Sequence, residues 1–209
     1  MSQQLRELFS DKKIIQRIQN KMPNLFQLAE IDNSRNGKLG MEIGSARERI
    51  IIALLIYKFG EENVDAKNSI TDAEVDVKLF GHPISIKTIT DSLAGVKLIW
   101  TVDEQKALEF AKNYKPTYDI LLTNIKWGKS GCFYYIPQSS QLKVFKKLRK
   151  EQYFKLPKAG TNPRGVEITE EALKLIVKDK DVMSIDINWI RSEMNYDAYD
   201  RWVELWHQD

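Results

Sequence analysis

The sequence is short of the residues on which several common kinds of site depend. It contains one cysteine, Cys132, and two histidines, His82 and His207. A single cysteine excludes an internal disulfide and a cysteine-based zinc site, and it is compatible with a reducing cytoplasm. Two histidines argue against a Ser-His-Asp hydrolase, a histidine-ligated metal nuclease and a histidine-dependent phosphodiesterase.

Long hydrophobic runs are also lacking. The longest extends from Ile50 to Tyr57 and is far shorter than the roughly 20 residues that a transmembrane helix needs. The N-terminal residues Gln3, Arg6 and Glu7 are polar or charged, unlike those of a signal peptide. We therefore expect a soluble cytoplasmic protein without membrane contact.

The composition permits one substantial core and an anionic partner. The 209 residues are 43% hydrophobic, which favours a single domain. The net charge of +3 permits nucleic-acid binding without requiring it. Basic residues are concentrated between Lys143 and Arg164, where eight Lys and Arg residues accompany the single acid Glu151. Such a run is either a solvated helix face or a contact for an anion.

Residues 74–88 alternate apolar and polar side chains around Gly81-His82-Pro83, which predicts a β-hairpin. A turn centred on Gly81-His82 would place Asp76 opposite Lys87 and Val77 opposite Ile86, with Cβ atoms about 5 Å apart. A carboxylate beside an ammonium group is either an exposed salt bridge or a site where a metal ion and a water cut a phosphodiester. The apolar face of the hairpin should be core, and it comprises Val75, Val77, Leu79, Ile84 and Ile86.

The rest of the chain predicts alternating helices and strands, and Pro23 should end the first helix. The predicted helices cover residues 3–21, 24–30, 41–59, 101–114, 139–150, 169–178 and 192–206. The further strands cover residues 96–100, 119–127, 132–136, 153–156 and 183–189. This pattern predicts an α/β fold with a mixed central β-sheet of about five or six strands flanked by helices. Core packing is the expected role of the aromatic residues in the last helix, with a protein interface as the alternative: Tyr196, Tyr199, Trp202 and Trp206.

Glu48 is the unusual residue of the predicted helix 41–59. It adjoins the apolar run 50–56, which should be buried nearly all round, and it lies between Arg47 and Arg49. A carboxylate in such a place needs a partner. It either pairs with a neighbouring arginine at the helix surface or points at the same metal ion as Asp76.

Hydrolysis of a phosphodiester gives these residue types a definite chemistry. A hard divalent cation neutralises charge on the phosphate and lowers the pKa of a bound water. Mg²⁺ prefers oxygen ligands and keeps several waters, so one or two carboxylates suffice. Asp76 is the expected principal ligand, with Glu48 bound directly or through water. Lys87 would orient or help deprotonate the attacking water and offset charge in the transition state.

The series Glu48, Asp76 and Ser85-Ile86-Lys87 resembles the PD-(D/E)xK type II restriction endonucleases. With Met41 before the helix, the whole chain is similar to the ThaI type of this family, which cuts CGCG to blunt ends. The resemblance implies the restriction-endonuclease-like fold and a Mg²⁺-dependent, site-specific deoxyribonuclease whose catalytic residues are Glu48, Asp76 and Lys87. It implies Asp76, Glu48 and the carbonyl oxygen of Ile86 as metal ligands.

Two positions depart from the family motif. Val75 stands where a proline precedes the aspartate, and Ser85 stands where the motif has an acid. A serine is a poor substitute for a carboxylate ligand, so the site is expected to hold one or two Mg²⁺ ions. Ser85 remains a candidate site residue. Glu74, two residues before Asp76 and on the same face of the strand, is the second-choice acidic ligand.

The DNA contacts implied by the resemblance lie in three polar stretches and at one methionine. For G·C pairs, basic side chains suit guanine and hydroxyl or acidic groups suit cytosine. Met41 either wedges between base steps from the minor groove or packs on its own helix, and the resemblance favours the wedge. Each stretch has a solvated loop as its alternative. The candidates are Arg35, Lys38, Thr88, Thr90, Ser92, Asn162 and Arg164.

The same reading predicts one endonuclease domain, residues 1–209, with three parts. These are a helical N-terminal part at about 1–40, a catalytic core at about 41–136 and a basic, DNA-facing part at about 137–209. A palindromic target in double-stranded DNA implies a homodimer with one active site per strand. A DNA methyltransferase would be its counterpart in a restriction-modification system.

Three alternatives belong to other classes. The first is a structure-specific or repair nuclease of the same fold, and it predicts cleavage of DNA without CGCG sites. A second is a non-catalytic DNA-binding module in which Ser85 marks the loss of activity. The third is an unrelated α/β protein in which Asp76 and Lys87 merely pair, and it predicts no salt-dependent DNA binding.

Overall fold

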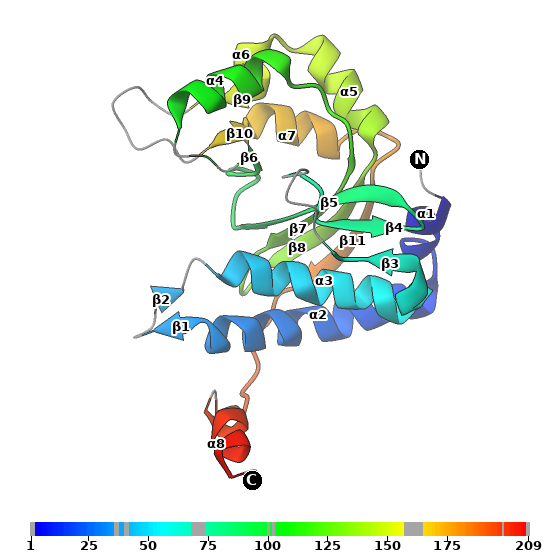
Figure 1. Ribbon diagram of the computed structural model, residues 1–209. Coiled ribbons are helices and arrows are strands. Elements are labelled where there is room, and N and C mark those ends of the chain that lie inside the picture. The colour runs from blue at the N-terminus through cyan, green and yellow to red at the C-terminus, as the bar shows by residue number, and fades with distance from the viewer. Residues whose placement is uncertain are drawn as a thin grey trace.

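A computed structural model describes residues 3–35, 38–39, 42–67, 74–99, 101, 103–156, 165–197 and 199–207. Its centre is a six-stranded sheet with the strand order β11-β8-β7-β5-β4-β3, in which only β5 and β7 run parallel. Figure 1 shows α2 and α3 below this sheet and a second lobe above it, which contains α4 to α7. The predicted α/β fold with a mixed sheet flanked by helices is confirmed.

The six strands of the main sheet are β3 (Val64–Asp65), β4 (Val77–Leu79), β5 (His82–Thr90), β7 (Asp119–Ile125), β8 (Ser130–Ile136) and β11 (Met183–Asn188). The short β3, which follows the 3-10 turn Glu61–Asn63, was not predicted. Odd-numbered and even-numbered residues of β7 face opposite cores, as Leu121 and Leu122 show. Both faces of the sheet are therefore covered, which accounts for its nearly continuous apolar strands.

The β4–β5 hairpin forms as predicted, but its register differs by two residues. Val77 lies opposite Ile84 rather than Ile86, because Phe80 and Gly81 alone form the turn. Both have positive φ angles, 49° and 77°, as a two-residue type I′ turn requires. A shift by two residues leaves every side chain on its predicted face. The apolar face of the hairpin is accordingly buried.

The N-terminal helices differ from the prediction at Pro23. The structure has α1 (Gln3–Leu8) and α2 (Lys12–Asp32), and Pro23 lies buried inside α2. The break falls instead at Asp11, whose carboxylate accepts hydrogen bonds from the amides of Lys13 and Ile14. The proline removes one helical hydrogen bond. Continuing the helix buries Phe26 and its apolar neighbours against the sheet, which outweighs that loss.

Helix α3 (Ile43–Phe59) ends at the predicted cap, Gly60. The run 50–56 was expected to be buried nearly all round, and this is wrong, since only Ile51 and Leu55 within it are fully buried. The reason is that α3 lies in the outer layer with α2 and packs on the sheet through one side (Figure 1). The polar stretch before α3 contains a short hairpin, β1 (Ser34–Arg35) with β2 (Lys38–Leu39), instead of an irregular loop.

The second lobe is built on a separate three-stranded sheet of order β6-β10-β9. The predicted strand 96–100 belongs here and not to the main sheet. Asp103 caps α4, which therefore begins three residues later than predicted, and α5 begins directly after Pro137 and ends at Lys147 rather than at residue 150. The elements are β6 (Lys97–Ile99), α4 (Glu104–Asn113), α5 (Gln138–Lys147), α6 (Lys150–Tyr153), β9 (Phe154–Lys155), β10 (Val166–Ile168) and α7 (Glu170–Val177).

The C-terminal helix is shorter and more exposed than predicted. Only α8 (Asp200–Trp206) is helical, because the preceding segment hydrogen-bonds to α2 instead of to itself. The backbone of Ser192 exchanges two hydrogen bonds with Gln27. The expectation that the aromatic residues of this helix belong to the core is wrong, and Trp206 is 89% exposed. None of the described helices has the length and apolar character that a membrane crossing requires.

A buried carboxylate joins the N-terminal helices to the C-terminal segment. Glu30 on α2 is 3% exposed. It accepts hydrogen bonds from Arg47 of α3 at 2.6 Å, from Arg191 at 2.6 Å and from the indole of Trp127 at 2.9 Å. The Arg191 guanidinium also lies over the Trp127 ring, 4.2 Å from its centroid. This Glu30 cluster fixes the position of α3 on α2.

We predict that Glu30→Gln lowers the free energy of unfolding by about 3–5 kcal/mol, because it leaves the buried charge of Arg47 without a carboxylate. Urea denaturation measures this. The control is Glu170→Gln, which removes an exposed i,i+4 pair with Lys174 and should cost less than about 0.5 kcal/mol. Equal losses in the two variants would contradict the structural role of the Glu30 cluster.

Candidate active site

The hairpin holds the Asp76 carboxylate in one orientation. Asp76 directly precedes β4, and its amide donates to the carbonyl of Ile84 at 3.0 Å. Its Oδ2 atom accepts hydrogen bonds from Lys87 Nζ at 3.1 Å, from the amide of Ile86 at 2.6 Å and from Ser85 Oγ at 3.2 Å. All three donors belong to consecutive residues of β5. The predicted contact between Asp76 and Lys87 is therefore present despite the changed register.

This arrangement leaves one carboxylate oxygen for a ligand. The side chains of Asp76 and Lys87 are only 19% and 18% exposed, so their charges interact through a medium less polar than water. Oδ2 receives every donor that reaches Asp76 within the described residues. Oδ1 is free of them and can bind a cation. The pair is thus more enclosed than the surface salt bridge considered as its alternative.

Glu48 on α3 lies close enough to this pair for their charges to interact. Partial burial, and then the Asp76 carboxylate, raise the pKa of Glu48 from 4.5 to about 7, while Lys87 opposes the rise. Arg47 forms its ion pair with Glu30. A surface pair between Glu48 and Arg47 is accordingly wrong. The structure brings Glu48, Asp76 and Lys87 together from a helix and two strands.

The donor set fits a hard cation that retains waters. In the part of the chain that the structure describes, no three His, Cys, Asp or Glu side chains form a group able to hold a metal ion. Two carboxylates, Glu48 and Asp76, are what the residues supply. Mg²⁺ is bound in proteins through one or two carboxylates, with waters and phosphate completing its octahedron. A cation would also relieve the repulsion that helps to raise the pKa of Glu48.

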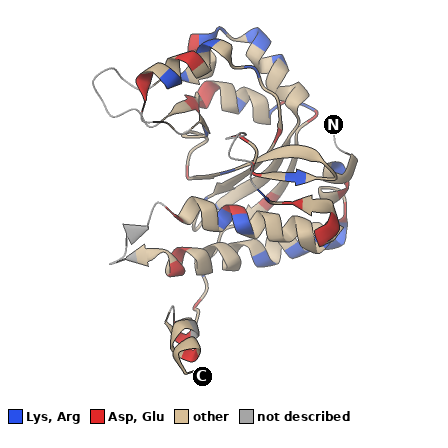
Figure 2. Ribbon diagram, in the orientation of Figure 1, with Lys and Arg blue, Asp and Glu red and all other residues tan. Residues whose placement is uncertain are grey.

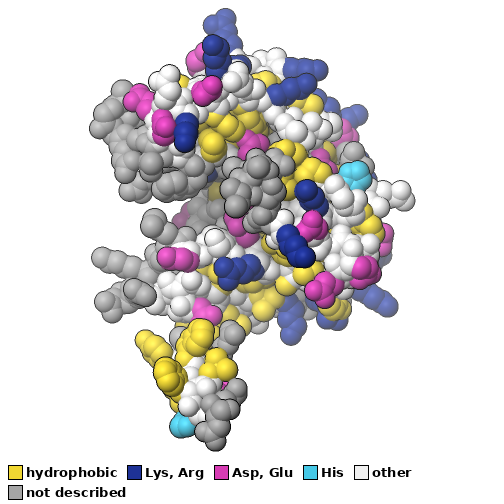
Figure 3. All heavy atoms as spheres, in the orientation of Figure 1, with side chains coloured by type: hydrophobic (Ala, Val, Ile, Leu, Met, Phe, Trp, Pro, Cys, Tyr) yellow, Lys and Arg dark blue, Asp and Glu magenta, His cyan; other side chains and the backbone are white. Residues whose placement is uncertain are grey.

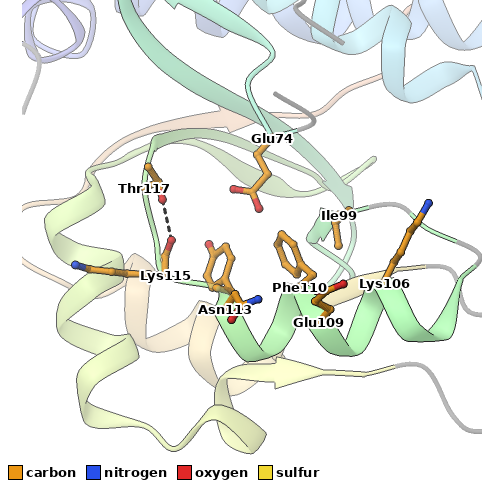
Figure 4. A pocket seen from close by; sticks show the side chains of 9 residues that line it. Glu74, Ile99, Lys106, Glu109, Phe110, Asn113, Lys115 and Thr117 are labelled. Carbon is orange, nitrogen blue, oxygen red and sulfur yellow. Dashed lines mark hydrogen bonds between the residues drawn. The ribbon is translucent and has the colours of Figure 1, made fainter. Parts of the chain in front are cut away.

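Ser85 and Glu74 border one small cavity together with Lys87, but they have different contacts. Ser85 is 5% exposed, and its hydroxyl donates to Asp76, so it orients the carboxylate without adding a charge. Glu74 contributes to a cavity of about 450 Å³ beside α4. Figure 4 shows its carboxylate pointing into this cavity, toward Phe110, and Tyr114 also lines the cavity. Glu74 therefore does not complete a three-carboxylate group with Glu48 and Asp76. Nothing in the sequence indicated that α4 would line the cavity beside Glu74.

The candidate DNA-reading residues fall into two groups. Thr88 and Thr90 belong to β5, which is longer than predicted, and Thr90 and Ser92 are exposed. The backbones of Arg35 and Lys38 pair in the β1–β2 hairpin. The side chains of Arg35 and Lys38, and the whole of Met41, Asn162 and Arg164, lie outside the described residues.

The space-filling view shows a hollow between the two lobes (Figure 3). Lys and Arg residues of the upper lobe are spread over its helices (Figure 2). Part of the basic run is already neutralised, because Lys143 pairs with Asp179 and Asp181, and Lys155 lies 3.9 Å from Glu167. The solvated-face interpretation therefore applies to part of that run.

The raised pKa of Glu48 predicts a pH dependence of stability without divalent metal. The folded protein binds the Glu48 proton more tightly than the unfolded chain does. The free energy of unfolding should therefore fall as pH rises from about 4.5 to about 7. Glu48→Gln removes this contribution, so the variant should gain stability relative to wild type across that interval. Urea denaturation in EDTA at several pH values measures the difference. The control is Glu42→Gln, at an exposed residue before α3, and its free energy of unfolding should change with pH as that of wild type does. If the free energy of unfolding of Glu48→Gln also follows wild type, the prediction is contradicted.

Two comparisons with known proteins agree with this geometry. The family model for restriction endonuclease ThaI matches residues 8–208. A solved structure described as "Restriction endonuclease in complex with substrate DNA" is 55% identical in sequence, with a TM-score of 0.92, and the match covers 98% of this chain and 99% of that one. A comparison with curated proteins gave no match. Since the family match covers nearly the whole chain, the protein belongs to the ThaI family of type II restriction endonucleases.

Proposed function

We propose that this enzyme hydrolyses phosphodiester bonds of double-stranded DNA with Mg²⁺ as its cofactor, and that it cuts CG/CG to leave blunt ends. The observation that carries the proposal is the meeting of Glu48, Asp76 and Lys87 at one partly buried position. The solved relative bound to substrate DNA supports the choice of substrate. The CGCG target and blunt ends rest on the family resemblance.

Asp76 Oδ1 and the Glu48 carboxylate are the proposed metal ligands, with the backbone carbonyl of Ile86 as a third oxygen. The ion, one or two per site, would supply an activated water and neutralise charge on the scissile phosphate. Ser85 and the Ile86 amide hold Asp76 Oδ2 in place, so Oδ1 keeps a fixed direction. Because only two carboxylates of the described residues meet here, we propose one tightly bound ion.

Lys87 has two proposed roles. Its ammonium group lies 3.1 Å from Asp76 Oδ2, which keeps it beside the ligand carboxylate. From there it donates hydrogen bonds that orient the attacking water, and it offsets the negative charge that develops on the phosphate. The proton released by the water can pass to a neighbouring group or to solvent.

We propose that Thr88, Thr90, Ser92, Arg35 and Lys38 contact the duplex, that the stretch from Thr161 to Arg164 does so through Asn162 and Arg164, and that Met41 enters the minor groove. The exposure of Thr90 and Ser92 to solvent supports their proposed contact with the duplex.

We also propose that the chain acts as one domain, residues 1–209, and as a homodimer, since a palindromic site offers each strand to one active site. The family match over residues 8–208 supports the single domain. The enzyme would work in the cytoplasm, with a DNA methyltransferase protecting the host sites.

Digestion of a CGCG-bearing duplex with Mg²⁺ tests the function. Wild type should give discrete blunt fragments, and EDTA should abolish them. Asp76→Ala, Lys87→Ala and Glu48→Ala should each lower the single-turnover rate by about 10²-fold or more, because each removes a group that binds the ion or stabilises the transition state.

Two controls sharpen this experiment. Lys78→Ala removes a lysine from the other strand of the same hairpin and should leave the rate within about threefold. A duplex without CGCG should stay intact. Full activity of the Asp76 or Lys87 variant would place the active site elsewhere, and cleavage of both duplexes would indicate a nuclease without this specificity.

A further inference from the structure

The C-terminal helix α8 exposes a cluster of large apolar side chains. The exposed fractions are 73% for Tyr199, 51% for Val203, 47% for Leu205 and 89% for Trp206. Soluble proteins seldom leave such a cluster in water unless a partner covers it. Figure 3 shows these apolar side chains gathered on α8, which projects from the body of the molecule. We call residues 192–206 the C-terminal arm.

The same chain carries an apolar groove. It lies between α2 and α3 on the side away from the sheet, with a volume of about 340 Å³. Its lining includes Ala53 and Leu54, together with Leu25 and Tyr57, which are exposed. The groove exists because α3 carries more apolar residues than its sheet-facing side can bury. We call it the α2–α3 groove.

Charge favours contact between the arm and the groove. Arg17 and Lys21 border the groove, and the Arg17 guanidinium lies 4.8 Å from the centroid of the Tyr57 ring. The arm is net acidic, with Glu193, Asp197, Asp200 and Glu204 against the single basic residue Arg201. Opposite charges around an apolar centre are the usual arrangement of a protein interface, with tryptophan and tyrosine as its main anchors.

The base of the arm is already fixed on its own chain. Tyr196 donates from its hydroxyl to Asp32 at 2.6 Å, and Ser192 is bound to Gln27. Tyr196 and Trp202 line a cavity of about 530 Å³ that shares Leu25 and Ile50 with the α2–α3 groove. The arm thus lies at one end of the groove with its tip directed into solvent. Because its base is anchored, docking the tip costs less conformational entropy than docking a free tail.

We infer that the arm of one copy docks into the α2–α3 groove of a second copy, and that this exchange forms the homodimer. In a two-fold dimer each copy gives an arm and receives one, so both exposed surfaces are buried twice. The inference rests on the homodimer proposed above and names its surfaces. It joins the copies through α2 and α3, and α3 also carries Glu48.

Sedimentation of the full-length protein without DNA tests the apolar anchor. Wild type should be a dimer at micromolar concentration. Trp206→Ser should raise the dimer Kd by at least 100-fold with an unchanged thermal melt of the monomer, since the side chain is exposed. The matched control is Leu108→Ser, at an exposed leucine of α4 in the other lobe, which should leave the Kd unchanged. A monomeric wild type, or a Trp206→Ser variant with the wild-type Kd, would overturn the inference.

Charge reversal tests the pairing itself. Lys21→Glu and Glu204→Lys should each raise the dimer Kd by about tenfold, and the double variant should return it to within about threefold of wild type. If the double variant restores wild-type behaviour although the protein stays monomeric, the arm folds onto its own groove. This result would overturn the inference. If the charge-reversal variants lose DNA affinity while their sedimenting mass stays unchanged, the groove is a DNA contact. This result would also overturn the inference.

The outcome for the dimer is separable from that for cleavage. If the protein is a monomer and still cuts the CGCG duplex, the arm exchange is refuted and the proposed function stands. If the protein is a dimer and cuts no DNA, the proposed function is refuted and the arm exchange stands.

Discussion

The two-residue turn at Phe80 and Gly81 determines which side chains meet at the candidate active site. It sets the register of the β4–β5 hairpin, so the Asp76 carboxylate reaches the amide of Ile86 and the side chains of Ser85 and Lys87. A one-residue slip would turn Asp76 to the opposite face. The backbone hydrogen bond at 2.6 Å holds the carboxylate without a charge, which leaves its other oxygen for a ligand. Ser85, where the family motif has an acid, is therefore compatible with a fixed orientation of the Asp76 carboxylate.

A second constraint sets the position of the helix that carries Glu48. Arg47, its neighbour in sequence, is buried against Glu30 of α2. Consecutive helical residues point about 100° apart, so fixing Arg47 on α2 directs Glu48 away from α2 and toward Asp76. The buried ion pair costs desolvation, and its benefit is a fixed orientation of α3. Arg191 extends the same cluster to the segment before the C-terminal arm, so the base of the arm and the active-site helix depend on one carboxylate.

The active site combines local rigidity with an unfavourable charge arrangement. Glu48 and Asp76 repel one another, which contributes to the raised pKa of Glu48. Sites that bind cations commonly retain such repulsion, since the ion removes it on binding. The exposed arm and the open α2–α3 groove follow the same pattern at a larger scale. Each is costly in the isolated chain, and each would be relieved by a proposed partner, a cation at Glu48 and Asp76 or a second copy at the arm and the groove.

The sequence by itself determined the features that depend on local periodicity. Alternation in residues 74–88 gave the hairpin and its buried face, and the helix 43–59 followed from its apolar spacing and Gly60. The pairing of Asp76 with Lys87 was likewise predictable, because both lie on one face of one hairpin. Only the tertiary structure decided that α2 continues through Pro23, that 97–99 joins a second sheet and that Trp206 is exposed. It also brought Glu48 to Asp76. These outcomes depend on which surface packs against which, and a one-dimensional pattern holds no record of contacts between distant segments.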